Sequence, residues 1–548
     1  MTHPLFRKKS ISQAVGDSGS EHNQLNKVLG VRDLTSFGIA AIIGAGIFST
    51  IGLASANGGP AVSLLFVAVA VACVFTALSY AQFASTVPVS GSAYTYAYVA
   101  FGELFAWIIG WALILEYAVS NMVVAISWSE YFTSMLNGFG IKFPRWLSTD
   151  YGSAASAAAR ALKGEVLTGG EQMLAAAYNA APALGSLKFI INLPAGLITV
   201  LVTAVVYIGI KESRTASNIL VVLKLAVIGL VIAAGAFFVK PENWSPFAPN
   251  GVAGVLKSVA SVFFAFIGFD SISTTAEECK NPQRDLPRAM IYCLIICTVL
   301  YVLIILVLTG MVDYKELNVA DPLAYVFQKV HMDFIAGVIS VSAVVAITSA
   351  LLVYQLGQPR IWMTMSRDGL LWPKFATIHP KYHTPSFATI ITGALVAIPS
   401  LFMNMQFFVD RTSVGTFFAF ILVCGGILYL DSSGLAKQSK FKVPYVNGQY
   451  IVGPVFLASV AFAYSNGFLV ESLTAKPLQS LFWVTWAVLS VLSFQRKFSL
   501  LPILGVLTNL YLMTELGANN WGIFVGWLLV GLVLYFSYGF RHSKLAKA

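Results

Sequence analysis

Long apolar segments recur along almost the whole chain and constrain its fold more than any other feature. Each is close to the length of about 20 residues that an α-helix needs to cross the ~30 Å hydrocarbon core of a bilayer. Lipid offers no partner to an unpaired backbone N–H or C=O group, so such segments fold as helices. Fourteen are predicted, at about residues 34–55, 60–87, 102–128, 189–209, 216–239, 253–276, 287–311, 332–357, 385–404, 412–431, 451–470, 478–494, 499–514 and 520–540.

Composition indicates that the whole chain is embedded in a membrane. Of its 548 residues, 57% are hydrophobic and 11% are charged, whereas about 25% are charged in an ordinary soluble domain. The mean hydropathy is +0.77. Twelve or thirteen spans remain alternatives to fourteen, because the segments at 478–494 and 499–514 are short and nearly abut.

The distribution of lysine and arginine predicts the orientation. With the N-terminus inside, the inner segments carry 22 of the 34 basic residues and the outer loops carry 10. Cytoplasmic loops are enriched in these residues, so the net charge of +10 reflects topology and does not indicate nucleic-acid binding. We expect a multi-pass protein of the plasma or inner membrane with two cytoplasmic tails, residues 1–33 and 541–548. The polar head does not resemble a cleavable signal peptide.

No pattern of side chains indicates catalysis, a metal site or a cofactor. The five cysteines have no CxxC or CxxH spacing and lie in or beside apolar segments, which argues against disulfides and zinc. The histidines form no ligand spacing, and no pairing of a nucleophile with a base is evident. An enzyme is therefore disfavoured. An ion channel is disfavoured as well, because no selectivity filter or ring of charges is present.

Two of the predicted helices are interrupted by glycine. The first contains Ile42-Ile43-Gly44-Ala45-Gly46, and the sixth contains Phe264-Ala265-Phe266-Ile267-Gly268 followed by Asp270. A Gly-x-Gly pair alone often marks close helix packing, but an acidic residue near mid-membrane indicates function, although Asp270 could also cap the restarting helix. Spans 1–5 and 6–10 would then form a 5+5 inverted repeat, in which matching breaks point to the substrate site of a transporter.

Interrupted helices suit the two charged groups of an α-amino acid. The N–H groups that restart a helix lack partners and carry partial positive charge, so those near Gly44, Ala45 and Gly46 are assigned to the substrate carboxylate. The carbonyl groups that end the preceding half-helix are acceptors for an ammonium group. The predicted substrate-binding residues on the two breaks are Ile42, Ile43, Gly44, Ala45, Gly46, Phe264, Ala265, Phe266 and Ile267.

Several motifs follow one another in a specific order. They are Gly-Ala-Gly-Ile-Phe at 44–48, Gly-Trp-Ala-Leu-Ile-Leu-Glu-Tyr at 110–117, Gly-Ile-Lys-Glu-Ser at 209–213, Phe-Ile-Gly-Phe-Asp at 266–270 and Met-Ser-Arg-Asp-Gly-Leu at 365–370. Over about residues 30–400 and again over 499–543, the chain resembles the cationic amino acid transporter family of the amino acid–polyamine–organocation superfamily. The resemblance implies an all-α polytopic protein with the leucine-transporter fold and about fourteen transmembrane helices.

The resemblance also divides the chain into a transporter core, residues 34–431, and four additional helices, residues 432–540. A long outer loop, residues 137–187, interrupts the core. Its alanine-rich stretch at 154–162 favours a helix.

Lys224 lies inside the fifth predicted span with no acidic neighbour in sequence, at a cost of about 2.5–3.5 kcal/mol for a lysine at mid-span. In the proton-coupled members of the family that this chain resembles, a matching lysine puts its ammonium where sodium-coupled relatives hold a sodium ion. The resemblance therefore implies that Lys224 is a proton-coupling group, with Thr348 and Ser349 as candidate hydroxyl partners. The alternative is a lysine that extends to the inner interface.

Glu116 and Ile347 are predicted to decide the substrate class, and they point in opposite directions. Glu116 lies midway along the third span, where it would contact a cationic substrate side chain or form a structural hydrogen bond between helices. Ile347 faces the side-chain pocket according to the resemblance. A bulky apolar residue there would favour small neutral amino acids over arginine.

The sequence therefore predicts a proton-coupled symporter of α-amino acids that works by alternating access. An obligate amino acid or polyamine exchanger is the alternative within the same class. A nutrient-sensing receptor on a transporter scaffold is the alternative from another class. The predicted partners are an amino acid, a proton and the lipid bilayer, with no nucleic acid and no cofactor; the sequence does not indicate an oligomeric state.

Overall fold

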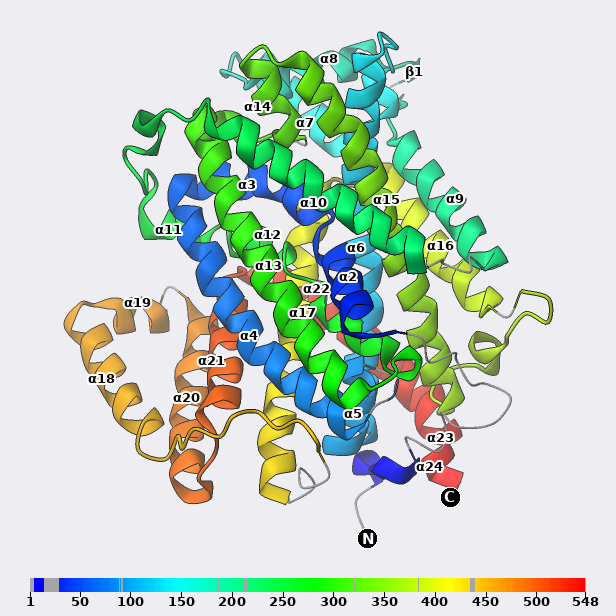
Figure 1. Cartoon of the computed structure of the whole chain (residues 1–548), viewed down its shortest axis with the longest axis vertical. Coiled ribbons are helices and arrows are strands. Elements are labelled where there is room, and N and C mark those ends of the chain that lie inside the picture. Colours follow the sequence, from blue (N-terminus) through cyan, green and yellow to red (C-terminus); the bar gives the residue numbers. More distant parts are fainter. Residues whose placement is uncertain are drawn as a thin grey trace.

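A computed structural model of the chain describes residues 4–13, 29–87, 89, 92–185, 187–209, 214–319, 321–382, 384–433, 439–474 and 476–547. These residues are mostly helical, as predicted (Figure 1). Residues 14–28 of the predicted N-terminal tail and residues 210–213 of one family motif lie outside the described ranges.

Each of the fourteen predicted ranges contains one or two helices. In chain order they are α2 (Val31–Ile42) with α3 (Ile51–Gly58), α4 (Val62–Thr86), α6 (Glu103–Gly138), α9 (Leu193–Ile208), α10 (Arg214–Ala236), α11 (Gly251–Leu256) with α12 (Val259–Phe264), α13 (Pro282–Met311), α15 (Asp333–Arg367), α16 (Ser386–Phe402), α17 (Met405–Ser433), α18 (Val452–Ser465) with α19 (Phe468–Thr474), α20 (Pro477–Arg496), α21 (Leu500–Thr514) and α22 (Ala518–Leu534).

The other elements are short or lie between these helices. Besides several short 3-10 and π-helices, they are α5 (Ser92–Ala100), α7 (Tyr151–Leu162), α8 (Gly169–Ala180), α14 (Pro322–Lys329), α23 (Phe540–His542), α24 (Lys544–Lys547) and the antiparallel strands β1 (Ala183–Leu184) and β2 (Leu187–Lys188).

Not every predicted span has the length of a full crossing. Among the described residues, eight helices are long and apolar enough to cross a membrane, or nine if α18 and α19 are counted as one span. Four further apolar helices are only 10–17 residues long, so a crossing by all fourteen stays a prediction. The eleventh span, expected at 451–470, is not straight: α18 and α19 meet at an angle of 98°, and Gly467 between them has a φ of +75°.

Two pairs of long helices form the centre of the molecule. The helix α6 packs along α15, and α4 packs along α13. Small residues permit these contacts: a Cβ atom on Gly357 of α15 would lie 2.7 Å from the ring of Tyr117 on α6. Such close approach is what stabilises helix pairs in lipid, where the hydrophobic effect adds little between them. The broken segments around α2, α3 and α12 lie against these pairs.

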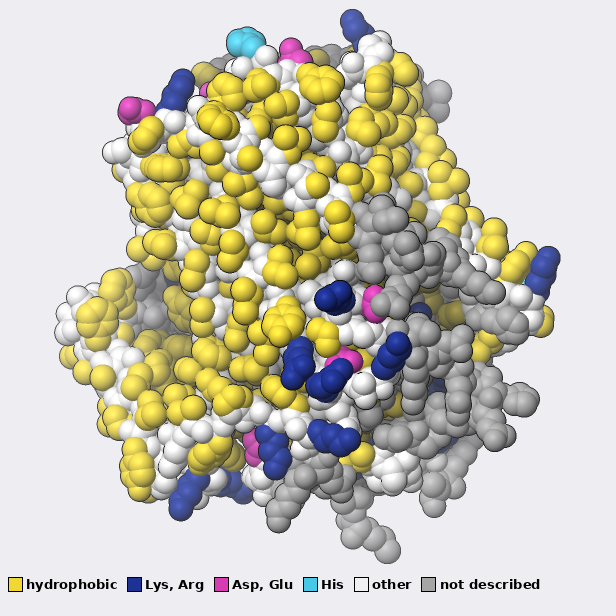
Figure 2. All heavy atoms as spheres, viewed as in Figure 1, with side chains coloured by type: hydrophobic (Ala, Val, Ile, Leu, Met, Phe, Trp, Pro, Cys, Tyr) yellow, Lys and Arg dark blue, Asp and Glu magenta, His cyan; other side chains and the backbone are white. Residues whose placement is uncertain are grey.

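Apolar side chains cover most of the face shown in Figure 2. On α13, for example, Ile295 and Val299 are each 54% exposed. Soluble proteins rarely expose contiguous apolar surface on this scale, so this surface fits contact with lipid and a multi-pass membrane protein. Most of the lysine and arginine side chains in view lie in the lower half of the molecule, the end at which both chain termini lie in Figure 1.

The long loop at 137–187 lies at the opposite end of the molecule (Figure 1). The predicted helix in its alanine-rich stretch is confirmed as α7, which begins where the Asp150 side chain accepts a hydrogen bond from the backbone N–H of Ser153. A second helix, α8, packs against α7.

Candidate functional site

The first helix is broken where the glycine pattern predicts. It ends at Ile42, and helical turns resume in a wide turn at Gly46–Thr50 that leads into α3. The N–H of Gly44 donates to the carbonyl oxygen of Ile42 at 3.0 Å, so it is used within the break. The N–H groups of Ala45 and Gly46 open the restarting helix, where no preceding turn supplies an acceptor.

The sixth predicted span is broken as well. Here α12 ends at Phe264, and a tight helix at Phe269–Glu278 follows. Between them Gly268 has a φ of +119°, a backbone conformation that only glycine adopts at little cost. The carbonyl groups of Ala265 and Ile267 accept hydrogen bonds from tyrosine hydroxyls, and one lone pair of each stays available for a ligand.

Close glycine packing brings the two breaks into contact. A Cβ atom on Gly46 would lie 2.5 Å from Cα of Ala265, and one on Gly268 would lie 3.0 Å from the backbone of Ala41. Helix packing and ligand binding are therefore compatible roles for the glycine pattern. The residues that permit close approach also place the backbone groups of both breaks side by side.

Two tyrosines contact backbone carbonyls at the breaks, and the sequence pattern identified neither. The hydroxyl of the buried Tyr301, on α13, lies 3.0 Å from the carbonyl oxygen of Ile42 and 2.7 Å from that of Ala265. From α15, the Tyr354 hydroxyl donates to the carbonyl oxygen of Ile267 at 3.3 Å. Each is a tyrosine in an apolar segment whose hydroxyl needs a partner when buried.

Lys224 reaches the end of the first half-helix. Its ammonium donates to the carbonyl oxygens of Ala40 and Ile43, at 3.0 and 2.9 Å. These carbonyl groups end α2, at the negative end of its dipole, so they stabilise a positive charge. The side chain is fully buried and reaches inward to the break; it does not extend to the membrane surface.

The predicted hydroxyl partners do not join Lys224. Ser349 donates to the carbonyl oxygen of Ala346 at 2.8 Å, and Thr348 donates to that of Val344 at 2.7 Å, both within α15. Serine and threonine inside a helix commonly satisfy their hydroxyls on the preceding turn in this way. Among the described residues, the acceptors of the Lys224 ammonium are backbone carbonyls.

A cluster of buried polar groups surrounds Glu116 and Asp270. Both carboxylates are 2% exposed, and they are close enough to interact electrostatically with each other and with Tyr80 and Tyr117. One oxygen of each, Glu116 Oε2 and Asp270 Oδ2, accepts no hydrogen bond from the described residues. A buried carboxylate needs a hydrogen-bond partner or a proton. These two oxygens are therefore acceptors that a partner or a proton could still occupy.

Comparison with known proteins identifies the family. The description "Amino acid permease" matches residues 29–492, and a second description, "C-terminus of AA_permease", matches residues 499–543. The first match alone covers most of the 548 residues. The chain belongs to the amino acid permease family.

Individual relatives of the permease are transporters as well. It is similar to the branched-chain amino acid permease BcaP of Bacillus subtilis (strain 168), with 37% identity over 100% of both chains. The methylthioribose transporter of the same organism is 36% identical over 99% of each chain. The vacuolar cationic amino acid transporter 2 of Arabidopsis thaliana is 30% identical over 99% of this chain and 94% of its own. The permease is thus a transporter and not an enzyme, and the predicted resemblance is confirmed.

The permease packs α15 directly on the first break. A Cβ atom on Gly44 would lie 3.0 Å from Cβ of Ala350. Ile347 is fully buried and lies three residues before Ala350, so the two share a face of the helix. This places Ile347 one turn from the break, and its contact with a substrate side chain stays a prediction.

Proposed function

We propose that the permease is a proton-coupled symporter of α-amino acids that works by alternating access in the cell membrane, with both termini in the cytoplasm. The observation that carries this proposal is the position of Lys224. Its ammonium is buried and bonded to two backbone carbonyls at the end of α2, beside the predicted substrate groups. A change in its charge therefore acts directly on the half-helix that would hold the substrate.

In this proposal the two breaks bind the charged groups of the substrate. The free N–H groups of Ala45 and Gly46 donate to the carboxylate, aided by the positive end of the restarting helix. The carbonyl groups of Ala265 and Ile267 accept from the substrate ammonium, each beside its tyrosine donor. Gly44 contributes its small size, since its N–H already donates to Ile42.

Coupling follows from the same contacts. When it is protonated, Lys224 donates hydrogen bonds to the carbonyl oxygens of Ala40 and Ile43. These bonds hold the end of α2 against α10. Without its proton, the amine loses the charge that the helix end stabilises, and α2 is freer to move. Substrate and proton would thus favour the same arrangement of the half-helix, which is the requirement for symport.

The proposed 5+5 inverted repeat has support in the order and packing of the helices. Counterpart helices of the two halves have similar lengths: 36 and 35 residues for α6 and α15, 16 and 17 for α9 and α16. Counterparts also pack against each other, α4 on α13, α6 on α15 and α9 on α16, as elements related by a pseudo-two-fold axis would. Alternating access by movement of one repeat against the other needs such an arrangement.

The proposed substrate class is neutral aliphatic amino acids. A buried isoleucine one turn from the break supports an apolar pocket of limited size, and a relative that shares 37% of its residues is a branched-chain amino acid permease. Glu116 lies near Asp270, and one of its oxygens accepts no hydrogen bond from the described residues, so its two predicted roles, contact with a cationic substrate and a structural hydrogen bond, both stay open. A methylthioribose-like sugar is the second candidate, because the relative that transports it is 36% identical.

Uptake into liposomes tests the proposal. Purified protein is given radiolabelled valine, arginine or methylthioribose, with and without an inward proton gradient, for the wild type and Lys224→Ala. The matched control is Lys257→Ala, which removes an exposed lysine at the end of α11. We expect the proton gradient to drive valine uptake in the wild type and in Lys257→Ala but not in Lys224→Ala. Arginine should not compete with valine for uptake.

Each alternative has its own outcome. Uptake that needs an internal amino acid and ignores the pH gradient would identify an exchanger. Binding of valine without uptake would identify a receptor, and preferential uptake of methylthioribose would replace the amino acid as substrate. Uptake in Lys224→Ala that responds to pH as the wild type does would overturn the coupling role.

A further inference from the structure

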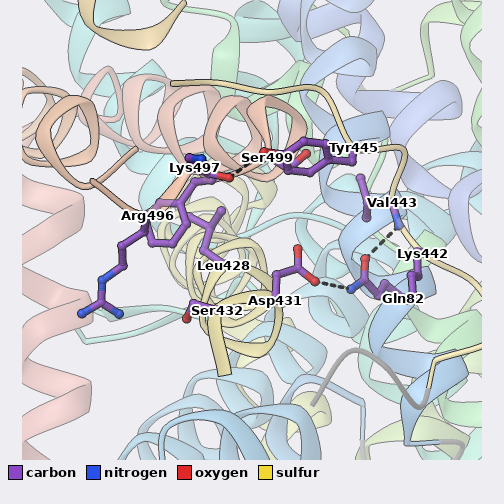
Figure 3. Close-up of a pocket in the computed structure, with 11 residues that line it drawn as sticks. Gln82, Leu428, Asp431, Ser432, Lys442, Val443, Tyr445, Arg496, Lys497 and Ser499 are labelled. Carbon is purple, nitrogen blue, oxygen red and sulfur yellow. Dashed lines mark hydrogen bonds between the residues drawn. The ribbon is translucent and has the colours of Figure 1, made fainter. Parts of the chain in front are cut away.

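A cavity of about 270 Å³ lies where helices of the predicted transporter core meet the additional helices (Figure 3). It is separate from the two breaks. The core contributes residues at the ends of α4 and α17, and the other wall consists of residues within 442–445 and the turn between α20 and α21. The lining residues are Gln82, Leu428, Asp431, Ser432, Lys442, Val443, Tyr445, Arg496, Lys497, Phe498 and Ser499.

Hydrogen bonds fix the two walls of this cavity. The Gln82 side chain, 1% exposed, donates to Asp431 Oδ1 at 2.9 Å and accepts from the backbone N–H of Val443 at 2.8 Å. On the other wall the Tyr445 hydroxyl donates to the carbonyl oxygen of Lys497 at 2.9 Å. Figure 3 shows these bonds among the lining residues. The backbone around the cavity is therefore held in place without help from the side chains of Lys442, Arg496 and Lys497.

Three cations line the cavity and one carboxylate opposes them. Lys442 lies near Asp431 and balances part of its charge. Arg496 and Lys497 are exposed, and neither side chain has an ion-pair or hydrogen-bond partner among the described residues. The lining thus carries a net positive charge that no carboxylate of the described chain neutralises, so it attracts an anion.

The surroundings of the cavity resemble the boundary between the apolar and head-group regions of a bilayer. On α20, Val491 and Phe494 are 57% and 59% exposed and lie within two turns before Arg496, so apolar surface gives way to cations over a short distance. The end of α20 also lies on the predicted cytoplasmic side, where anionic lipids attract basic residues. The helix α21 begins directly after Ser499, and the positive end of its dipole adds to the attraction.

We propose that this cavity binds the phosphate group of an anionic phospholipid. The apolar surface of α20 would contact the acyl chains, and Arg496 and Lys497 would pair the phosphate. Because one wall belongs to the core and the other to the additional helices, a bound lipid joins these two parts of the transporter. A phosphate-bearing solute would satisfy the same cations, so the test separates the two sources.

The test measures lipid binding to the full chain in zwitterionic detergent micelles. Native mass spectrometry and thermal unfolding follow titrations with phosphatidylglycerol, with phosphatidylcholine of the same acyl chains, and with inorganic phosphate. We expect phosphatidylglycerol alone to bind tightly and to raise the melting temperature. The double variant Arg496→Gln, Lys497→Asn should weaken that binding about 25-fold, at roughly fivefold for each cation. Asparagine suits position 497, where φ is +54°.

Two further variants make the result specific. Asp431→Asn removes the opposing carboxylate and should strengthen binding of phosphatidylglycerol several-fold. The double variant Lys374→Gln, Lys381→Gln removes two exposed cations from another predicted cytoplasmic loop, and should bind as the wild type does. Equal binding of the two lipids, or equal loss in both double variants, would overturn the proposal. Inorganic phosphate that binds the wild type tightly and competes with the lipid would assign the cavity to a soluble anion instead.

Discussion

Tyr301 contributes one hydroxyl to the place where two broken helices meet. The carbonyl groups of Ile42 and Ala265 lie beyond the regular hydrogen bonding of their helices, and both are buried. The Ile42 carbonyl also accepts from the N–H of Gly44, whereas the Ala265 carbonyl without the Tyr301 hydroxyl would carry the cost of an unsatisfied polar group. The Tyr301 hydroxyl carries one proton, which it donates to one of the two carbonyl oxygens at a time. It therefore keeps the two breaks close together, while the second lone pair of the Ala265 carbonyl remains available.

Replacing Tyr301 with phenylalanine tests this function of the hydroxyl. We expect substrate affinity to fall about three- to tenfold and the free energy of unfolding to fall by about 0.5–1.5 kcal/mol, the usual value of one hydrogen bond. Isothermal titration and thermal unfolding measure the two quantities. Tyr464→Phe is the control, because Tyr464 is 71% exposed. Wild-type affinity in Tyr301→Phe would show that the hydroxyl is not needed to position the breaks.

Asp321, at the start of α14 in the loop between α13 and α15, makes stability depend on pH. Burial raises the pKa of its carboxyl to about 6, although a hydrogen bond with Ser134 opposes the shift; the ordinary pKa is about 3.9. Between about pH 4 and 6 the folded state therefore binds more protons than the unfolded state, so stability falls as the pH rises.

Asp321→Asn should abolish this fall in stability between pH 4 and 6. Its melting temperature should change less than that of the wild type between pH 4 and 6, and should exceed it at pH 7. Thermal unfolding at several pH values measures the difference. Parallel curves for the two proteins would contradict a raised pKa at Asp321. Asp313→Asn is a suitable control, since Asp313 lies in the same loop and is exposed.

At the scale of elements, the two breaks act as one unit because glycine lets their backbones touch. The first break contacts a side chain of α15, and it contacts the backbone of the second break. A Cβ atom on Gly44 would be 3.0 Å from Cβ of Ala350, whereas one on Gly46 would be 2.5 Å from Cα of Ala265. A side chain can be shortened by mutation and a backbone cannot, so the two clashes differ in whether they can be relieved.

This difference predicts a rescue at one glycine only. Gly44→Ala should lower transport and destabilise the protein by about 1–3 kcal/mol through overpacking, and adding Ala350→Gly should restore most of the loss. Gly46→Ala should be more severe, and adding Ala265→Gly should not restore it. Gly229→Ala in α10, with nothing within 4 Å of its added Cβ, should be neutral. Uptake and thermal unfolding measure all five variants, and equal rescue at both glycines would contradict the contact geometry.

The sequence predicts these elements unevenly. Both breaks are predictable because glycine within an apolar span marks a helix break or a close helix contact, and here it provides both. The helix α7 is predictable from its alanines, and α8 had a local signal that was overlooked, the capping box of Thr168 and Glu171. The bend between α18 and α19 also had a local signal, because the polar turn sequence Ser465-Asn466-Gly467 joins the two helices. Tyr301 has no local signal at all, because its acceptor on Ile42 is 259 positions away, and the acceptors of Lys224 are backbone atoms that no residue type reveals.

At the scale of the whole molecule, topology and chemistry depend on each other. In the proposed topology the inner end carries the positive charges, the proposed lipid cavity and both termini, and the outer end carries the loop with α7 and α8. An even number of crossings satisfies all of these at once. Thirteen crossings would place the C-terminal helices on the outer side, away from the N-terminal segment that they contact: the guanidinium of Arg7 lies 5.3 Å from the ring centroid of Phe540.

Single cysteines introduced at exposed positions test the topology. The five native cysteines are all buried, so the wild type should give little background with a membrane-impermeant maleimide. In intact cells Lys163→Cys, in the loop between α7 and α8, should be labelled. Lys374→Cys and Arg541→Cys should be labelled only after permeabilisation, since fourteen crossings place both on the inner side. Labelling of Arg541→Cys in intact cells, with Lys374→Cys still protected, would require an odd number of crossings between them and would replace the fourteen-span topology with thirteen.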